Sequence, residues 1–228
     1  MTDTIRVLST LAVRGAFSEL VERFQAATGA NVDADFSPTL ALLDRLRGGE
    51  AADVVILTRE GLSEMLAERR VAAASYVDLA KSYVGLAVKA GRAHPDISSE
   101  AALRTALLGA RAVAYSRIGA SGILFAELIE RLGIAHAVNA HAVIIPSGLT
   151  AERLVTDEAD IAVQQISELK QVAGVEVVGP IPRELQVPAV FSVGRMAATD
   201  KVALSEQFLQ FLRSPEATSV LREAGLEP

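Results

Sequence analysis

The stretch Ala112–Gly133, AVAYSRIGASGILFAELIERLG, has the pattern that decides the fold. Val113 to Tyr115 are typical of a short buried strand, Arg117 to Ala120 of a turn, and Ser121 of the N-cap of a helix that Gly133 ends. The apolar face of that helix repeats at helical spacing, through Leu124, Phe125, Leu128, Ile129 and Leu132. A small-residue turn between a strand and a helix directs backbone N–H groups and the positive helix end to one point, which predicts an anion site. The alternative is an ordinary α/β turn with a good cap.

The same alternation of strand, turn and helix recurs along the chain. Strands are expected over residues 5–8, 31–36, 52–57, 83–88, 113–115, 142–145, 161–163, 175–178 and 187–193. Helices are expected after most of them, over residues 15–28, 39–47, 59–66, 99–107, 121–132, 148–156, 204–212 and 215–224, with a short helix capped by Ser167. This order predicts an α/β fold of doubly wound units, in which parallel sheets are covered by helices on both faces.

The domain organisation follows from the end of the chain. Residues after about 187 contain one expected strand and two expected helices, too few for a third domain, so they must pack on an earlier unit. We therefore expect two doubly wound lobes joined by a two-segment hinge. Residues 1–81 plus 187–228 form lobe 1, which is discontinuous, and residues 82–186 form lobe 2. The chain crosses between them near Lys81–Ser82 and Leu185–Gln186, and such crossings act as hinges.

Composition excludes several classes of function. The 228 residues are 50% hydrophobic, which is typical of a globular protein, and no apolar run approaches the ~20 residues that span a bilayer. A net charge of −6, no Trp and only 4% aromatic residues argue against a nucleic-acid partner. Without cysteine there are no disulfides, thiolates or sulfur-ligated metals, and no metal or other cofactor is expected. The first residues enter a strand without a signal peptide, so we expect a cytoplasmic protein, or a periplasmic one if a leader was removed.

The polar residues that follow the expected strands form the candidate site. In open α/β units ligands bind at the carboxyl ends of the strands, where hydroxyls, amides and helix N-termini meet. The candidate ligand-binding residues are Ser9, Thr10, Ser37, Thr39, Arg117, Ser121, Ser147 and Gln165. These residues also have purely structural interpretations. In these the hydroxyl side chains serve only as helix caps, and Arg117 is a turn residue in contact with solvent. Since side chains alternate along a strand, only one of Gln164 and Gln165 can face the ligand.

Four longer stretches together resemble a known family across nearly the whole chain. They are FQAATGANVDADFSPTLALLDRLRGGEAADVVI (24–56), ASGILFAELIERLGI (120–134), LVTDEADIAVQQ (154–165) and SEQFLQFLRSPEATSVLREAGL (205–226). In these stretches the chain resembles the molybdate-binding family of class II periplasmic binding proteins. The resemblance implies a two-lobed hinge fold that binds a small oxyanion, and a place in an ABC transporter only if the protein is exported.

The ligand residues of that family match only in part. By spacing, the family's serine on the first loop falls on Ala12, with hydroxyls displaced to Ser9 and Thr10. The family's second serine falls on Thr39, and its tyrosine after a late strand falls on Gln165. Small apolar contacts of the family fall on two serines, Ser121 and Ser147. We therefore expect a ligand other than molybdate, although a molybdate or tungstate transport component stays an alternative.

A closer likeness points to a particular ligand class. VDLAKSYVGLAVKAG (77–91), HPDISSEAALR (94–104), VAYSRIGASG (113–122) and QQISEL (164–169) resemble the branch of the family that includes aconitate isomerase. That branch implies a small polycarboxylate ligand, which planar donors such as Arg117 and Gln165 suit. Two functions stay open: a protein that only binds the anion, and an isomerase that moves a proton within an unsaturated tricarboxylate. The isomerase needs a proton carrier, and the expected ligand loops contain no obvious Glu, Asp or His, so Ser9, Tyr115 or a water would serve. A third possible function is that of a ligand sensor, which passes the closure of its lobes to a partner protein.

Overall fold

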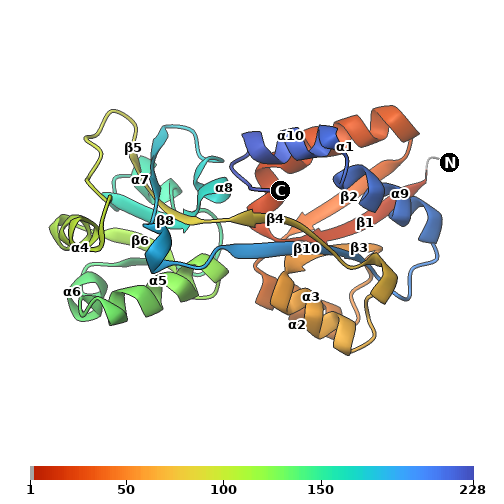
Figure 1. Cartoon of the computed structure of the whole chain (residues 1–228), viewed down its shortest axis with the longest axis horizontal. Coiled ribbons are helices and arrows are strands. Elements are labelled where there is room, and N and C mark those ends of the chain that lie inside the picture. Colours follow the sequence, from red (N-terminus) through yellow and green to blue (C-terminus); the bar gives the residue numbers. More distant parts are fainter. Residues whose placement is uncertain (1–2) are drawn as a thin grey trace. The chain divides into compact units, whose positions relative to one another are not determined.

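The computed structural model describes residues 3–228, and their contacts divide the chain into two compact units. Unit 1 contains the chain up to Lys81 and again from Val190, and unit 2 runs from Ser82 to Ala189 (Figure 1). The second crossing therefore lies three residues later than the sequence predicts. Each unit contains one mixed five-stranded sheet among the described residues.

The sheet of unit 1 has the strand order β2-β1-β3-β10-β4. Its strands are β1 (Thr4–Ser9), β2 (Asn31–Phe36), β3 (Val54–Thr58), β4 (Val77–Ser82) and β10 (Ala189–Arg195). β1 pairs in parallel with both β2 and β3, while β10 is antiparallel to β3. The central strand β3 is buried along Val54–Leu57, which explains its unbroken apolar run. The sequence missed β4.

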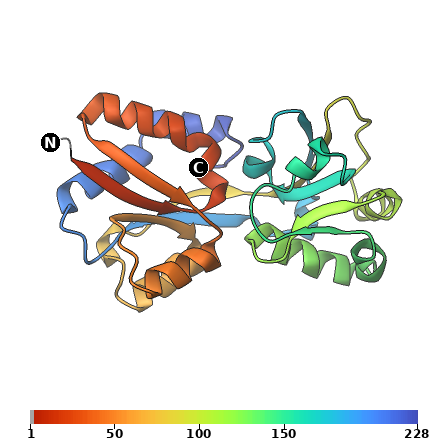
Figure 2. The same cartoon turned by 180° about the vertical axis from the view of Figure 1, so that it is seen from behind.

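Helices cover this sheet on both faces, and the end of the chain belongs to this unit. The helices are α1 (Arg14–Thr28), α2 (Thr39–Arg47), α3 (Arg59–Ala67), α9 (Val202–Leu212) and α10 (Pro215–Glu223), with short 3-10 turns at Leu11–Val13 and Ala73–Ser75. α9 and α10 pack on α1, and α10 lies beside α1 in both Figure 1 and Figure 2. The contact between α9 and α1 is aromatic: the ring centroid of Phe24 in α1 lies 5.0 Å from that of Phe208 and 5.6 Å from that of Phe211, both in α9.

The sheet of unit 2 has the strand order β7-β6-β8-β5-β9. Its strands are β5 (Val84–Lys89), β6 (Val113–Ser116), β7 (Val143–Ile145), β8 (Ile161–Gln165) and β9 (Val175–Pro180). β6 pairs in parallel with both β7 and β8, whereas β5 is antiparallel to β8 and β9. β9 continues through Gly179 and Pro180, two residues beyond the strand that the sequence predicts over 175–178.

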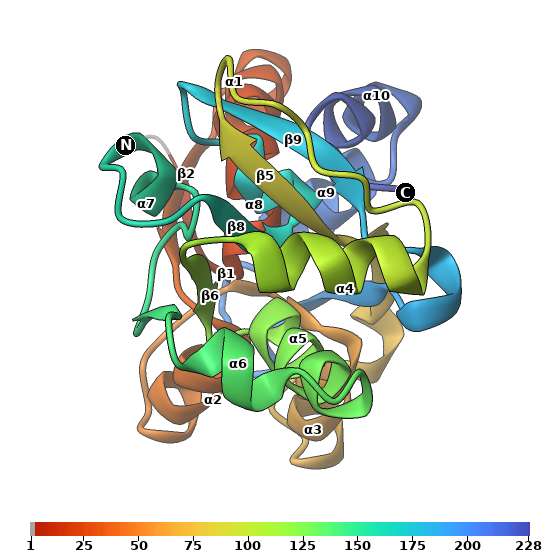
Figure 3. The ribbon, with the colours of Figure 1, turned by 90° about the vertical axis from the view of Figure 1, so that its left-hand side faces the viewer.

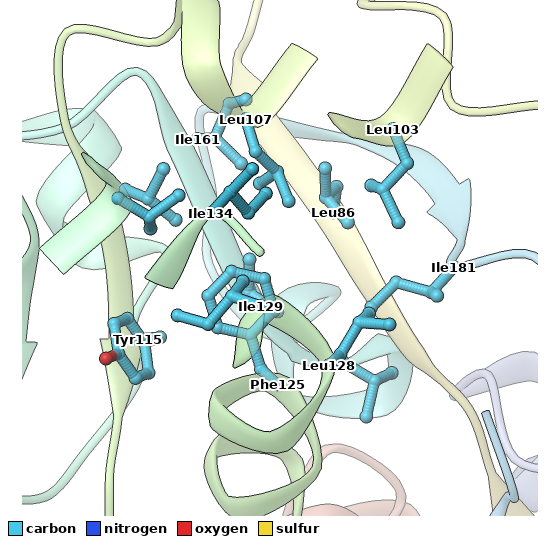
Figure 4. Packing of buried hydrophobic residues seen from close by; sticks show 14 of the residues in the cluster. Leu86, Leu103, Leu107, Tyr115, Phe125, Leu128, Ile129, Ile134, Ile161 and Ile181 are labelled. Atoms are coloured by element: carbon cyan, nitrogen blue, oxygen red, sulfur yellow. The ribbon is translucent and has the colours of Figure 1, made fainter. Parts of the chain in front are cut away.

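The helices of unit 2 bury two apolar faces of this sheet. They are α4 (Glu100–Gly109), α5 (Ala120–Arg131), α6 (Ala135–Asn139), α7 (Glu152–Val155) and α8 (Ile166–Leu169), with a 3-10 turn at Arg183–Leu185. Figure 3 shows α4, α5 and α6 together on one side of the strands. The larger core lies there, with Phe125, Leu128 and Ile129 of α5 against Tyr115 and Leu86 of the sheet (Figure 4). The ring centroids of Tyr115 and Phe125 are 5.0 Å apart.

The start of α5 differs from the sequence prediction. Gly119, not Ser121, is the N-cap, and Ser121 is the second residue of the helix. The first turn of α5 also passes close to the end of β6, because a Cβ atom at Gly122 would lie 1.5 Å from the carbonyl oxygen of Ser116. A glycine is therefore required at position 122. The predicted end of the helix at Gly133 is confirmed, because Gly133 has a φ of +66°.

In both units the crossing segments attach at the carboxyl edge of the sheet, meaning the edge where the parallel strands end. In unit 1 Phe191, near the start of β10, pairs with Thr58 at the end of β3. In unit 2 Val84, the first residue of β5, pairs with Gln165 at the end of β8. Each carboxyl edge therefore carries both the strand-to-helix turns and a connection to the other unit.

Candidate functional site

The first group at the carboxyl edge of unit 1 follows β1. Ser9 and Thr10 are both buried, and the Ser9 hydroxyl donates to the carbonyl oxygen of Thr10 at 3.1 Å. The Thr10 N–H donates to the carbonyl oxygen of Ile56 at 3.0 Å. Thr10 Oγ1, however, is buried without a hydrogen-bond partner within residues 3–228. Since Thr10 precedes the 3-10 turn that leads into α1, this unpaired hydroxyl lies at a helix entrance.

The second group of unit 1 joins the ends of β2 and β3. Thr39 begins α2, and its hydroxyl accepts the N–H of Thr58 at 3.2 Å, while the Thr58 hydroxyl accepts the N–H of Gly61 at 3.3 Å. The Ser37 hydroxyl accepts a hydrogen bond from Arg45 at 3.1 Å. Arg45 is itself paired with two carboxylates, Asp35 and Glu50, so its charge is neutralised within unit 1. The predicted residues Ser37 and Thr39 thus lie at the same edge of the sheet, and the hydroxyl group of each already accepts a hydrogen bond.

The β6–α5 turn of unit 2 holds two predicted residues, Arg117 and Ser121. Arg117 is exposed, and its guanidinium donates to Tyr115 Oη at 3.4 Å and to Asn139 Oδ1 at 3.3 Å. Both partners are neutral, so no carboxylate of the described residues neutralises Arg117. Ser121 is buried in the first turn of α5. The turn therefore places a guanidinium with neutral partners beside a helix N-terminus, and binding of an anion there stays a prediction.

The turn after β7 is organised by a side chain that the sequence analysis set aside. Ser147 is exposed in this turn. Gln164 is buried and reaches across to it: Nε2 donates to Gly148 O at 3.0 Å, and Oε1 accepts the N–H of Thr150 at 2.8 Å. The Thr150 hydroxyl adds a 3.1 Å bond to the same oxygen. Gln164 thus fixes the turn that presents Ser147.

Gln165, the amide that we expected to face a ligand, holds the crossing strand. With Nε2 toward the acceptors around it, the buried Gln165 amide donates to Ser82 Oγ at 3.1 Å and to the carbonyl oxygen of Tyr83 at 3.2 Å. A second amide acts on the same strand, because Gln186 Oε1 accepts the N–H of Val84 at 2.9 Å and Nε2 donates to Val84 O at 3.1 Å. Both glutamines therefore anchor the segment that enters unit 2.

The structure corrects the expectation that the ligand loops contain no Glu, Asp or His. An acidic side chain does lie at the carboxyl edge of unit 2: Glu168, in α8 immediately after β8, is buried. Burial raises the pKa of Glu168 to about 8, opposed by hydrogen bonds from the Gln165 backbone and the Gln164 side chain. The spacing of Gln165 and Glu168 is that of a capping box, a signal that was available in the sequence. The two proton carriers proposed instead are engaged, Tyr115 with Asn139 and Ser9 with Thr10.

The eight predicted ligand-binding residues fall into two groups in the sequence, and each group lies in a different unit of the structure. Unit 1 brings together Ser9, Thr10, Ser37 and Thr39, and unit 2 brings together Arg117, Ser121, Ser147 and Gln165 at its own edge. Contact of one ligand with both groups stays a prediction. Within the described residues no cluster of His, Asp and Glu could hold a metal ion, and no helix is long and apolar enough to cross a membrane.

Two hollows lie at the opposite edges of the sheets, and their linings include paired charges. In unit 2 a hollow of about 730 Å³ beside the start of β8 includes Lys89, which is paired with Asp157. In unit 1 a hollow of about 650 Å³ includes Asp53, which accepts hydrogen bonds from Arg6 N and from Lys201. These carboxylates fix loops and already have their partners, so the carboxyl edges are the better candidates for a ligand.

Two doubly wound units linked by two crossings define the fold of class II periplasmic binding proteins. Solved structures agree. The periplasmic molybdate-binding protein of Azotobacter vinelandii superposes with a TM-score of 0.84 at 18% identity, covering 98% of this chain and 99% of its own. The sulfate-binding protein of Mycobacterium tuberculosis H37Rv gives a TM-score of 0.80 at 17% identity, covering 99% and 87%. At such identities the likeness establishes the fold, which confirms the predicted fold class.

Sequence comparisons establish the family. The family described as bacterial extracellular solute-binding protein matches residues 5–227. An aconitate isomerase from Pseudomonas sp. is 32% identical over 231 aligned positions, which cover 99% of this chain and 88% of that protein. The chain therefore belongs to the bacterial extracellular solute-binding protein family. The resemblance seen in the sequence, including the branch with aconitate isomerase, is confirmed.

Proposed function

We propose that this protein binds a small di- or tricarboxylate through the groups at its carboxyl edges. The observation that carries the proposal is the buried Thr10 hydroxyl without a partner. A buried hydroxyl without a hydrogen bond costs roughly 1–3 kcal/mol, and a ligand oxygen that accepts its proton would remove that cost. Thr10 stands where the chain leaves β1 for α1, which is where ligands bind in this class of fold.

The chemistry of the second edge supports an anion with planar oxygens. Arg117 has neutral partners, and a guanidinium binds a carboxylate through two parallel N–H donors. Glu168, with its raised pKa, is mostly protonated at neutral pH and adds no repulsive charge. The aconitate isomerase relative makes tricarboxylates the first ligands to test.

A second function is isomerisation of the bound tricarboxylate. It is favoured by the 32% identity to an aconitate isomerase along almost the whole chain. Interconversion of aconitate isomers needs only a proton shift, so no cofactor is required. Transport of molybdate or tungstate is the less favoured alternative, because Gln165 stands where the resemblance implies a phenol, and its amide is occupied by the crossing strand. The compartment of the protein, and with it a transporter partner, stays a prediction.

Calorimetric titration with a ligand panel tests the proposal. The panel contains cis- and trans-aconitate, citrate, succinate, sulfate, molybdate and tungstate. We expect an aconitate isomer to bind at least tenfold tighter than any inorganic oxyanion in the panel. At equal ligand concentration it should also raise the melting temperature more than those oxyanions do. Sub-micromolar molybdate binding without measurable carboxylate binding would overturn the proposal. Incubation with trans-aconitate, followed by NMR detection of the cis isomer, tests the second function separately.

A further inference from the structure

The acid at the carboxyl edge of unit 2 has a position that its neighbours determine. Glu168 is in α8, which packs on β5, β8 and β9 (Figure 3). Its carboxyl group accepts hydrogen bonds from the Gln165 backbone and the Gln164 side chain. Gln164 also holds the Gly148–Thr150 turn. One amide therefore connects the acid to the turn that carries Ser147, a predicted ligand residue.

Within residues 3–228 no salt bridge accounts for this buried acid. The three strands packed against α8 carry two charged side chains. Lys89 of β5 is bonded to Asp157, and Glu176 of β9 is bonded to His94. β8 contributes uncharged residues, and Lys170, which follows Glu168 by two positions, is exposed. Burial is the main cause that raises the pKa of Glu168 to about 8, so the acid can change its protonation near neutral pH.

A purely structural acid would not need these properties. A capping glutamate is typically exposed and ionised, because its charge then interacts with the helix N-terminus at no desolvation cost. Glu168 is instead only 8% exposed, so ionisation of its carboxyl group carries a desolvation penalty. Perturbed acids in such surroundings are typical of proton transfer, since a general base works best with a pKa near the working pH.

We propose that Glu168 is the proton carrier of a 1,3-proton shift in a bound unsaturated tricarboxylate. This inference rests on the proposed function in its isomerase form. The Glu168 carboxylate takes a proton from the methylene carbon next to the double bond, and the C–H electron pair moves into the conjugated carboxylate system. The proton then returns from Glu168 to the far carbon of the three-carbon unit, and the double bond moves. Glu168 ends as a carboxylate, substrate and product have one formula, and no co-reactant is consumed.

The carrier must be ionised to begin the reaction, which fixes the direction of the pH dependence. Below pH 8 most Glu168 is protonated and inactive as a base, so turnover should rise with pH and level off above about 8. In a base whose pKa is ordinary for glutamate, the rate would already be flat at pH 6. This profile is measured on the unmodified protein and does not depend on whether a variant folds.

Glu168→Gln is the decisive variant, because glutamine keeps the size and the hydrogen bonds but cannot carry a proton. Glu152→Gln is the matched control: Glu152 is also an acid in the first turn of a short helix of unit 2, but it is exposed. Each protein is incubated with trans-aconitate in D₂O. Formation of the cis isomer and deuterium incorporation are followed by NMR, affinity by calorimetry and folding by circular dichroism. We expect Glu168→Gln to bind within threefold of the parent and to lose at least a thousandfold in the rate of isomerisation, while Glu152→Gln matches the parent.

The outcomes separate this inference from the proposed function. Isomerisation by Glu168→Gln within tenfold of the parent, or a flat profile from pH 6 to 9, overturns the role of Glu168 and leaves the binding function standing. Tight binding by a parent that neither forms the cis isomer nor exchanges deuterium has the same meaning. If no polycarboxylate binds the parent, the proposed function fails and the inference fails with it.

Discussion

The carboxyl edges of the two units are built from the same strand-turn-helix device but differ in their titratable groups. At the edge of unit 1 hydroxyls stand beside three guanidiniums: Arg45 is paired with Asp35 and Glu50, Arg59 with Asp78, and Arg14 lies 6.0 Å from the centroid of the Phe36 ring. At the edge of unit 2 Arg117 has neutral partners only, and Glu168 is a buried acid. Both edges can therefore recognise charge, while the edge of unit 2 adds an acid that can move a proton.

This difference shows that topology sets where a ligand can bind, while individual side chains set what can happen there. Both edges have parallel strands ending side by side and a crossing segment attached. Only at unit 2 do side-chain amides, Gln164 and Gln165, connect the turns, the crossing strand and a titratable group.

Gly122→Ala should remove the edge of unit 2 altogether. The new Cβ would lie 1.5 Å from Ser116 O, so either β6 or α5 must move, at a cost of more than about 4 kcal/mol of unfolding free energy. Gly119→Ala is the control, because its Cβ would meet nothing within 4 Å and should cost at most about 1 kcal/mol. Urea denaturation measures both. Equal stability of the two variants would show that the close approach at β6 does not constrain the fold.

Glu168→Gln should stabilise the folded protein above pH 6. Between the ordinary pKa of 4.5 and about 8 the unfolded chain has lost the proton that the folded protein keeps. The unfolded state then binds fewer protons, so the stability of the parent falls as pH rises through this window and levels off above 8. The variant lacks that loss, an advantage of roughly 2–4 kcal/mol at pH 8 that vanishes near pH 4. Melting temperatures of both proteins from pH 4 to 9 measure it; parallel curves would show an ordinary, ionised Glu168.

Arg117→Ala should weaken carboxylate binding about ten- to a hundredfold, or roughly 1.5–3 kcal/mol, because it removes a charge-assisted hydrogen bond. Ser121→Ala should cost less, since the N–H groups of the α5 first turn remain. Arg104, an exposed residue of α4, provides the control substitution to alanine, which should leave affinity unchanged. Calorimetry measures all three. An unchanged affinity for Arg117→Ala would place the charge-recognising group elsewhere.

Thr10→Val should have the smallest effect and tests unit 1. Valine replaces a buried unpaired hydroxyl by a methyl group of similar size, so stability should rise by about 1 kcal/mol. If the hydroxyl donates to a ligand, affinity should fall about five- to tenfold. Ser205→Ala in α9 is the matched control, because Ser205 Oγ is also buried without a partner in the described residues. The Ser205→Ala variant should gain stability without losing affinity for the ligand. If Thr10→Val also keeps the affinity of the parent, Thr10 does not belong to the binding site.

Much of the fold was predictable because each element depends on local signals. The predicted helix end at Gly133 and the predicted helix starts at residues 59 and 215 follow from short stretches, since capping depends on residues within one turn. The apolar run of β3 predicted a covered strand. Strand β4 was missed, because its partner β10 lies more than a hundred residues away and its own pattern is weak.

The sequence by itself determined the α/β fold, the family and the residues that end the parallel strands, since these follow from periodicity and from resemblance along the chain. Only the tertiary structure showed that Gly119 caps α5 and that Gly122 lies against Ser116, because the contact with Ser116 is an approach between two backbones. It alone placed Gln165 on Ser82 and Gln164 on the turn before Thr150. It also decided the protonation of Glu168. A pKa depends on what surrounds the carboxyl group in three dimensions, and a capping-box spacing does not reveal whether the acid is exposed or buried.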